Sequence, residues 1–302
     1  MDITDIKDIT DFLPKYPNIV TPINQLLNPY DNNDFYKNIY NKKEFYDERL
    51  EPTENISSVA GNLLKHQKII SRFFSSYTPY NELLLFHAMG TGKSCSAIGA
   101  IENIKNAGGF RGVLYIAKGA ALINNFRQEL IFKCTAGQYI PEDYENLTDL
   151  EKVHRTKKTT NVFYNFNTFE TFAKKIKETN DNILQEKYNN FIIVIDEIHH
   201  LRIQNNPKGL NIYNQFNHFL HTEQNCKTLL LSGTPMKDNV DEIASVMNLI
   251  LPTDKSLPTG EQFINEFFTS ESSSLDSSLD SSLDSSLDSS LDSSLDSSLD
   301  SS

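Results

Sequence analysis

The sequence predicts an α/β fold in which helices flank a parallel β-sheet, and three patterns lead to this prediction. Residues 83–107 read as a short buried strand, a glycine-containing loop and a helix with isoleucines on one face. Residues 192–195 form a continuous β-branched run, which is typical of a parallel strand buried on both faces. Further apolar runs at 112–117 and 228–231 alternate with helical patterns, as in α/β proteins.

Composition supports a real core and sets limits on the class of partner. The chain has 302 residues, of which 38% are hydrophobic, enough for one or two domains. Its net charge is −12, and eight of the negative charges lie in residues 271–302, which leaves −4 for the rest. This mild acidity argues against a dominant nucleic-acid-binding field but leaves room for a local basic groove.

The cysteines and the hydropathy point to an intracellular protein. Cys95, Cys134 and Cys226 lie far apart and show no metal-ligand spacing, so we expect structural thiols in a reducing compartment. We find no signal peptide and no apolar run long enough to cross a bilayer. A soluble intracellular protein is therefore expected.

Shifts in composition predict four regions. Residues 1–60 form a proline-interrupted N-terminal arm with a helix at about 33–48. Residues 61–252 form the α/β domain, and residues 253–270 form a polar linker. Residues 271–302 end in Leu-Asp-Ser-Ser repeated seven times, which buries too little apolar surface to fold and is predicted to be disordered.

Spacing of apolar residues predicts the remaining elements of the domain. Helices are expected over 63–76, 120–132, 169–177, 210–220 and 240–250. Residues 161–164 are read as a short strand. The stretch 138–160, with its basic run at 152–158, is interpreted as a solvated polar connector.

The glycine loop is the first candidate site. Gly90 and Gly92 permit a sharp turn, and their amides with the helix start at Ser94 form a nest for anionic oxygens. Lys93 would add a charge on phosphates, and the Ser94 hydroxyl would hold Mg²⁺. The template G-x-x-x-x-G-K-[ST] has glycine where this chain has His87. The alternative is a glycine turn with a chance Lys-Ser pair.

Two adjacent carboxylates follow the strand 192–195. Asp196 can hold Mg²⁺, and Glu197 can orient and deprotonate a water that attacks a phosphate. An ordinary acidic strand end is the alternative, but the glycine loop upstream favours a nucleotide site. His199 could link this site to the Ser-Gly-Thr-Pro turn at 232–235, whose hydroxyls could report the phosphate state.

Two further residues are ambiguous from their patterns alone. The Gln67 amide could pair with the N6 and N7 edge of adenine, or it could be a solvent-facing helix residue, and both interpretations stay open. Lys118 follows a strand at the ligand-binding edge and could touch a nucleic-acid phosphate. Taken alone, a solvated loop lysine is the favoured interpretation there.

As a set, these stretches resemble the first RecA-like half of a superfamily 2 DExH helicase. The resemblance is to the chromatin-remodeller-like helicases of large DNA viruses, a group that includes the poxvirus nucleoside triphosphatase I and the early transcription factor small subunit. The matching stretches are an adenine-reading motif at 64–67, a phosphate loop at 86–94, two elements that contact the nucleic-acid backbone at 116–130 and 167–172, a DExH motif at 196–199 and a Ser-Gly-Thr motif at 232–236.

The resemblance implies Mg²⁺-dependent ATP hydrolysis coupled to nucleic-acid translocation in viral transcription, with DNA favoured over RNA. It assigns ATP binding, catalysis and metal binding to motif positions, and nucleic-acid contact to the loops of Lys118 and Thr168. The implied ATP-binding residues are Gln67, Met89, Gly90, Thr91, Gly92, Lys93 and Ser94. The implied catalytic residues are Lys93, Asp196 and Glu197, with Ser94 and Asp196 on the metal.

The family's second RecA-like domain, which supplies arginine fingers, has no counterpart after position 252, and no Lys or Arg follows Lys255. We therefore expect weak ATP binding and slow hydrolysis from this chain alone, unless a second RecA-like domain or a transcription-complex partner acts in trans. Host cytoplasm, viral factory or virion is the implied location. One alternative is a truncated, non-catalytic binding subunit. A second alternative is a P-loop kinase or GTPase, but we find no base-specificity or acceptor-site motif that would support it.

Overall fold

A computed structural model describes residues 16–17, 33–49, 61–88, 90–201, 207–236 and 238–268. The chain divides into two units that meet between Leu257 and Pro258, and each is described by itself. The repeat tail at 271–302, predicted to be disordered, lies outside the described residues, as does most of the arm at 1–60.

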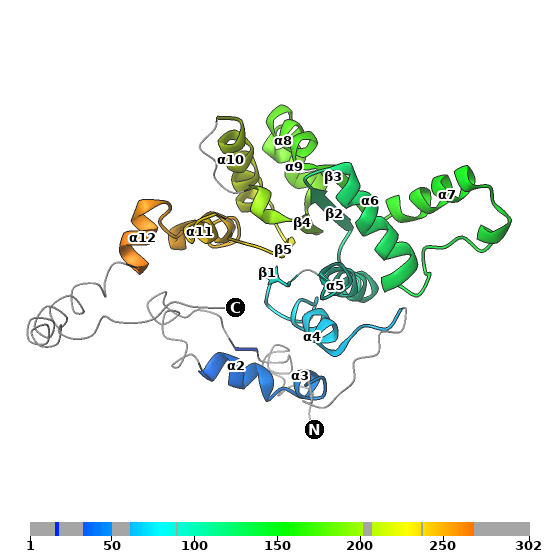
Figure 1. The fold of residues 1–302 in the computed structure, drawn as a ribbon, viewed down its shortest axis with the longest axis horizontal. Coiled ribbons are helices and arrows are strands. Elements are labelled where there is room, and N and C mark those ends of the chain that lie inside the picture. Colours follow the sequence, from blue (N-terminus) through cyan, green and yellow to red (C-terminus); the bar gives the residue numbers. More distant parts are fainter. Residues whose placement is uncertain are drawn as a thin grey trace, which may run out of the picture. The chain divides into compact units, whose positions relative to one another are not determined.

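The first unit is built on a five-stranded, wholly parallel sheet with the order β1-β5-β4-β2-β3 (Figure 1). The strands are β1 (Glu82–Phe86), β2 (Gly112–Ala117), β3 (Tyr164–Thr168), β4 (Phe191–Asp196) and β5 (Lys227–Ser232). The predicted α/β fold with a parallel sheet is confirmed. Because β5 lies between β1 and β4, the loops that follow β1 and β4 face each other across the tip of β5.

Helices cover both faces of the sheet. On one face lie α4 (Lys65–Phe73), α5 (Lys93–Ala107) and α6 (Ala120–Glu129). On the other lie α8 (Phe169–Glu178), α9 (Asp181–Tyr188), α10 (Pro207–Thr222) and α11 (Glu242–Met247). Strand residues alternate between the two cores: Val113 and Tyr115 pack with α5 and α6, whereas Leu114 and Ile116 pack with the opposite helices. This double burial explains the continuous apolar strands.

The remaining helices are α2 (Asn33–Tyr40), α3 (Lys43–Tyr46) and α7 (Asp149–Asn161). The single helix predicted at about 33–48 is wrong in detail, because the chain turns at Asn41 and Lys42 between α2 and α3. The second unit contains α12 (Glu261–Phe267), within the stretch read as a linker. None of the helices among the described residues combines the length and apolar content that a bilayer crossing requires.

The interpretation of 138–160 as a loop is wrong, because its second half forms α7. Thr148 and Glu151 make a reciprocal capping box at the start of this helix, with Thr148 N donating to Glu151 Oε2 at 2.9 Å. The strand placed at 161–164 instead runs over Tyr164–Thr168. This edge strand carries Asn165 and Asn167, and its polar positions masked the strand pattern.

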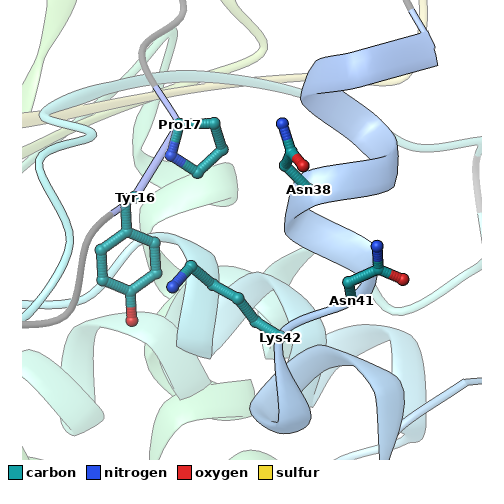
Figure 2. Close-up of a pocket in the computed structure, with 5 residues that line it drawn as sticks. All are labelled: Tyr16, Pro17, Asn38, Asn41 and Lys42. Atoms are coloured by element: carbon teal, nitrogen blue, oxygen red, sulfur yellow. The ribbon is translucent and has the colours of Figure 1, made fainter.

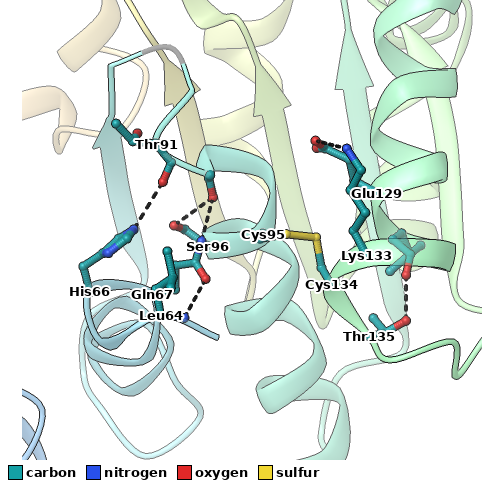
Figure 3. The surroundings of a disulfide bond; sticks show 12 residues. Leu64, His66, Gln67, Thr91, Cys95, Ser96, Glu129, Lys133, Cys134 and Thr135 are labelled. Atoms are coloured by element: carbon teal, nitrogen blue, oxygen red, sulfur yellow. Dashed lines mark hydrogen bonds and ion pairs between the residues drawn. A yellow bond between two sulfur atoms is a disulfide. The ribbon is translucent and has the colours of Figure 1, made fainter. Parts of the chain in front are cut away.

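The expectation of free structural thiols is wrong for two of the three cysteines. Cys95, the third residue of α5, forms a disulfide with Cys134, 39 residues later (Figure 3). Cys134 ends the π-helical turn Leu130–Cys134 that prolongs α6, while Cys226 is free. The bond therefore joins the start of α5 to the end of the α6 segment.

The disulfide is expected to stabilise the folded chain against its unfolded ensemble. Closing a loop of this length contributes about 3–4 kcal/mol in the chain-entropy account. Guanidinium unfolding of the double variant Cys95→Ser/Cys134→Ser should give a free energy of unfolding lower by that amount under non-reducing conditions. The variant Cys226→Ser is the control and should match the parent. A parent chain whose stability does not respond to a thiol reductant would contradict the bond.

A buried carboxyl predicts a pH dependence of stability. Both carboxyl oxygens of Glu223 are buried without a hydrogen-bond partner among the described residues, and burial with the nearby Asp181 charge raises its pKa from 4.5 to about 7. The folded state therefore binds the carboxyl proton of Glu223 more tightly than the unfolded state does. The stability that this proton contributes is present at low pH and is lost as pH rises through about 7. Melting curves of Glu223→Gln should lie above the parent at pH 8 and coincide with it near pH 5. The exposed Glu186→Gln should show no such crossover.

Candidate functional site

All five strands are parallel, so the loops predicted to carry function meet at one edge of the sheet. His87 follows β1, Lys118 follows β2, and Thr168 ends β3. Asp196 ends β4, and Ser232 ends β5. The predicted site residues that the structure describes therefore share this edge, with Gln67 reaching it from α4; Met89 lies outside the described residues.

The glycine loop has the backbone that an anion cradle needs. Gly90 and Gly92 both adopt left-handed conformations, with φ of 83° and 80°. Helix α5 begins at Lys93, and the N-cap position is occupied by Gly92, which has no side chain to accept the first-turn amides. The uncapped N-terminus of this 15-residue helix can therefore receive negative oxygens.

The first turn of α4 holds the glycine loop by two consecutive carbonyls. Gln67 Nε2 donates to Gly92 O at 3.2 Å, and His66 Nε2 lies 3.2 Å from Thr91 O (Figure 3). Gln67 Oε1 also accepts from Leu64 N at 2.9 Å. Gln67 is 4% exposed, so the solvent-facing alternative for this residue is wrong. Tying these carbonyls to α4 leaves the amides of the same trans peptides pointing the other way.

Lys93 joins the two predicted motifs. Its Nζ lies 2.7 Å from Glu197 Oε1 and 3.7 Å from Asp196 Oδ1, although 104 residues separate Lys93 from Glu197 in sequence. The three side chains are largely shielded from solvent, which strengthens the attraction between their charges. The contact spans the tip of β5, where His87 N donates to Ser232 O at 3.2 Å.

Asp196 is held in a fixed orientation by its neighbours. Tyr115 OH donates to Asp196 Oδ2 at 2.6 Å, and the Glu197 amide donates to Asp196 Oδ1 at 2.9 Å. Burial raises the pKa of Asp196, and the hydrogen bond from Tyr115 opposes that shift. Glu197 has φ of 52°, a left-handed conformation that is strained for a residue with a side chain.

A histidine connects the carboxylates to the next strand. His199 Nδ1 lies 3.3 Å from Glu197 Oε2 and 3.2 Å from Ser232 Oγ. Ser232 Oγ in turn accepts from the Thr234 amide at 3.0 Å. The link expected from the position of His199 is present, and it makes one contiguous polar cluster from the tip of β4 to the turn after β5.

The two residues assigned to nucleic acid lie on the same edge but outside this cluster. Lys118 is exposed, and its Nζ lies 3.4 Å from His200 Nδ1. Thr168 caps α8, since its hydroxyl accepts from the Thr171 amide at 3.3 Å. Neither the exposure of Lys118 nor the cap formed by Thr168 tests a contact with nucleic acid, so that role stays a prediction.

A cavity of about 380 Å³ lies elsewhere, between Tyr16, Pro17 and α2 (Figure 2). Asn38, Asn41 and Lys42 complete its lining, and the Lys42 ammonium sits 4.4 Å above the Tyr16 ring. Tyr16 also packs edge-on against Tyr80, which precedes β1. This cavity is therefore near the amino end of β1, away from the glycine loop at the carboxyl end.

Sequence reasoning missed one residue of the cluster, Tyr115. It sits in the middle of β2 and reads as an ordinary strand aromatic. A polar group within an otherwise apolar strand, two positions from the carboxyl edge, was the available signal. Its partner became visible only from the register, which pairs Tyr115 with Val194 of β4, two residues before Asp196.

The chain matches a described protein family and several viral proteins. A family profile named "Type III restriction enzyme, res subunit" covers residues 53–237. "Putative helicase 009L" of Frog virus 3 is 45% identical over 193 residues, covering 64% of this chain and 20% of the relative. "Putative ATP-dependent RNA helicase" of Heliothis virescens ascovirus 3e is 30% identical, covering 69% of this chain and 21% of the relative.

A third relative bears on the poxvirus resemblance. "Nucleoside triphosphatase I" of Heliothis armigera entomopoxvirus is 26% identical over 208 residues, covering 66% of this chain and 29% of the relative. The resemblance to viral helicases and to this group is thus confirmed. The chain spans less than a third of the length of each of these three relatives.

The two loop glycines offer a matched test of the α4 contact. Both have left-handed backbones, but a Cβ on Gly92 would lie 2.5 Å from Gln67 Nε2, whereas a Cβ on Gly90 meets nothing within 4 Å. Gly90→Ala should lower the free energy of unfolding by about 1–2 kcal/mol through backbone strain alone. Gly92→Ala should lose about 1 kcal/mol more because it displaces the Gln67 hydrogen bond. Equal losses in urea unfolding would show that Gln67 does not hold the loop.

Proposed function

Since the chain belongs to the family of the Type III restriction enzyme res subunit (ResIII), we propose that it is the ATP-binding lobe of a viral superfamily 2 DExH helicase. In this proposal it binds Mg²⁺-ATP at the carboxyl edge of the sheet and hydrolyses the terminal phosphate. In the longer protein, hydrolysis drives translocation on nucleic acid during viral transcription.

One observation carries the proposal: Lys93 Nζ touches the carboxylates of both Glu197 and Asp196, at 2.7 and 3.7 Å. A lysine at the start of an uncapped helix, facing an acidic pair on another strand tip, supports a phosphate cradle opposite a proposed general base and a proposed metal ligand. A chance Lys-Ser pair after a glycine turn would not require this contact between distant stretches.

The chain's own groups divide the binding of ATP among them. The amides of residues 90–94 and the Lys93 ammonium receive phosphate oxygens. Gln67 donates one amide hydrogen to Gly92 O and accepts one hydrogen bond from Leu64 N. Its second amide hydrogen is proposed to bond to adenine N7, and the second lone pair of its oxygen to accept from adenine N6. The proposed adenine contact is thus compatible with the hold that Gln67 has on the loop.

The donor set suits Mg²⁺. Among the described residues no group of three or more His, Cys, Asp and Glu could hold a metal, but Mg²⁺ needs only one or two protein oxygens beside substrate phosphates. Asp196 and the Ser94 hydroxyl are hard oxygen ligands of that kind, on β4 and on the second residue of α5. Bound there, Mg²⁺ would neutralise charge on the phosphates.

Glu197 is the proposed general base. In the structure its carboxylate is shared between Lys93 and His199, at 2.7 and 3.3 Å. Transfer of the Lys93 contact to a phosphate would free one carboxylate oxygen to orient and deprotonate the attacking water. His199 would keep the other oxygen in place and relay the change to Ser232.

Nucleic acid is the proposed partner at the Lys118 and Thr168 loops, because both loops lie at the carboxyl edge of the sheet, beside the residues proposed to bind ATP. The sequence resemblance favours DNA, whereas one relative carries the name of an RNA helicase. Arginines from a second RecA-like lobe, in the same protein or in trans, would complete the site, and such arginines contribute about 10³–10⁵ in rate in related enzymes. Slow hydrolysis by these 302 residues alone is therefore part of the proposal.

Glu197→Gln is the decisive variant. The amide cannot accept the proton of water, so the rate of ATP hydrolysis should fall at least about 100-fold while ATP binding persists. Lys93→Ala should weaken ATP binding itself. Phosphate release and the binding of a fluorescent ATP analogue measure the two effects separately.

Adding single-stranded DNA, duplex DNA or RNA to the same assay tests the partner. Lys118→Ala should retain basal hydrolysis and lose stimulation by the preferred nucleic acid. A parent chain that binds no ATP, or that hydrolyses ATP equally well with Glu197→Gln, contradicts the proposed enzyme. A different outcome would support a non-catalytic subunit: the parent chain binds no ATP, and Lys93→Ala leaves its binding of nucleic acid unchanged.

A further inference from the structure

A buried tyrosine outside the recognised motifs, Tyr115, donates a hydrogen bond to the proposed metal ligand Asp196. We propose that Tyr115 is a positioning residue that turns one oxygen of Asp196 toward the glycine loop and ties this carboxylate to α6. The inference rests on the proposed function, because it concerns the Mg²⁺ dependence of ATP binding at the same site.

The hydrogen bonds of Asp196 distinguish its two oxygens. Oδ2 accepts from Tyr115 OH at 2.6 Å, on the side of the neighbouring strand β2. Oδ1 accepts from the Glu197 amide and lies 3.7 Å from Lys93 Nζ, so it faces the glycine loop. The two oxygens of an ionised carboxylate are equivalent, so what such contacts determine is the rotation of the carboxylate about its Cβ–Cγ bond. The Tyr115 hydroxyl holds the oxygen on the β2 side and thereby sets the direction in which the other oxygen points.

Tyr115 is packed between aromatic rings of two elements. Its side chain is fully buried, and its ring stacks on Phe126 of α6 with the centroids 4.0 Å apart. Phe166 of β3 meets the same ring edge-on at 5.7 Å. A donor locked by packing on two sides is the arrangement that gives a metal ligand a defined direction.

The stacking extends the contact toward the loop proposed to meet nucleic acid. Phe126 lies on α6, which begins at Ala120 just after Lys118 and Gly119. A shift of α6 would therefore move the Tyr115 ring and, through its hydroxyl, the Asp196 carboxylate. Tyr115 is the direct physical link between the helix after the Lys118 loop and the proposed metal ligand.

The same core offers a matched control. Tyr164 is also fully buried, and its hydroxyl donates to a carboxylate, Glu102 Oε1, at 2.5 Å. Glu102 lies on α5, ten residues after Gly92, and takes no part in the site cluster. Tyr164→Phe thus removes the same kind of hydroxyl from the same kind of acceptor, away from Asp196.

The test is Mg²⁺-dependent binding of a fluorescent ATP analogue to the full 302-residue chain. Tyr115→Phe should raise the Mg²⁺ concentration for half-maximal tightening by about tenfold or more, as for other groups that orient metal ligands. Its affinity for the analogue in EDTA should match the parent, because the proposed phosphate contacts of the loop amides and Lys93 do not involve the Tyr115 hydroxyl. Tyr164→Phe should match the parent in both conditions.

Equal Mg²⁺ dependence in Tyr115→Phe and Tyr164→Phe would overturn the inference while leaving the proposed function intact. A parent chain that binds no analogue with or without Mg²⁺ would overturn the proposed function and the inference together. If Tyr115→Phe does not fold, Phe126→Leu provides the second variant, since it keeps the hydroxyl and loosens the ring. A folded Phe126→Leu with parental Mg²⁺ dependence would count against the link through α6.

Discussion

The contact of Lys93 with the carboxylates after β4 is the constraint on which the site depends. It requires that the loop after β1 and the end of β4 lie one strand apart, with the tip of β5 between them. Only a parallel sheet delivers all of these ends to one edge. The apolar strands, buried by helices on both faces, therefore do more than form a core: they set the distance between a lysine and its acidic partners.

Placing three charges in a shielded cluster is unfavourable unless each is paired, because charges lose solvation on burial. The structure pairs these charges with groups on or next to four strands. Lys93, after β1, pairs with Glu197, and Tyr115 of β2 and the Glu197 amide after β4 donate to Asp196. His199 lies beside Ser232 of β5. The left-handed backbone of Glu197 is a further strain that the surrounding packing must overcome. Strain and paired burial at one place are typical of a site selected for function rather than for stability.

The sequence predicted what local patterns determine and missed what depends on tertiary partners. The strands at 112–117 and 191–196 and the start of α5 were clear, because apolar runs and a glycine loop are signals within a few residues. Helix α7 was missed although Thr148 and Glu151 spell a capping box, since its exposed, charged surface resembles a loop. The Cys95–Cys134 bond and the Tyr115–Asp196 contact join distant stretches, and no spacing rule could pair them.

Strand β2 carries a residue proposed to orient the metal ligand and leads into the loop proposed to contact nucleic acid. Its geometry therefore bears on how ATP binding and nucleic-acid binding could be coupled. Its side chains alternate, so Tyr115 faces α5 and α6 while its neighbours Leu114 and Ile116 face the opposite helices. The same strand ends at Ala117, and Lys118 follows it on the edge proposed for nucleic acid. Because β2 is paired with β3 and β4, the proposed link from the Lys118 loop to Asp196 runs through the contact of α6 with the Tyr115 ring rather than through sliding of β2. The proposed route through the stacked Phe126 ring and the Tyr115 hydroxyl can be broken by removing a single oxygen atom, which separates it from the second contact between the two regions, that of Lys118 with His200.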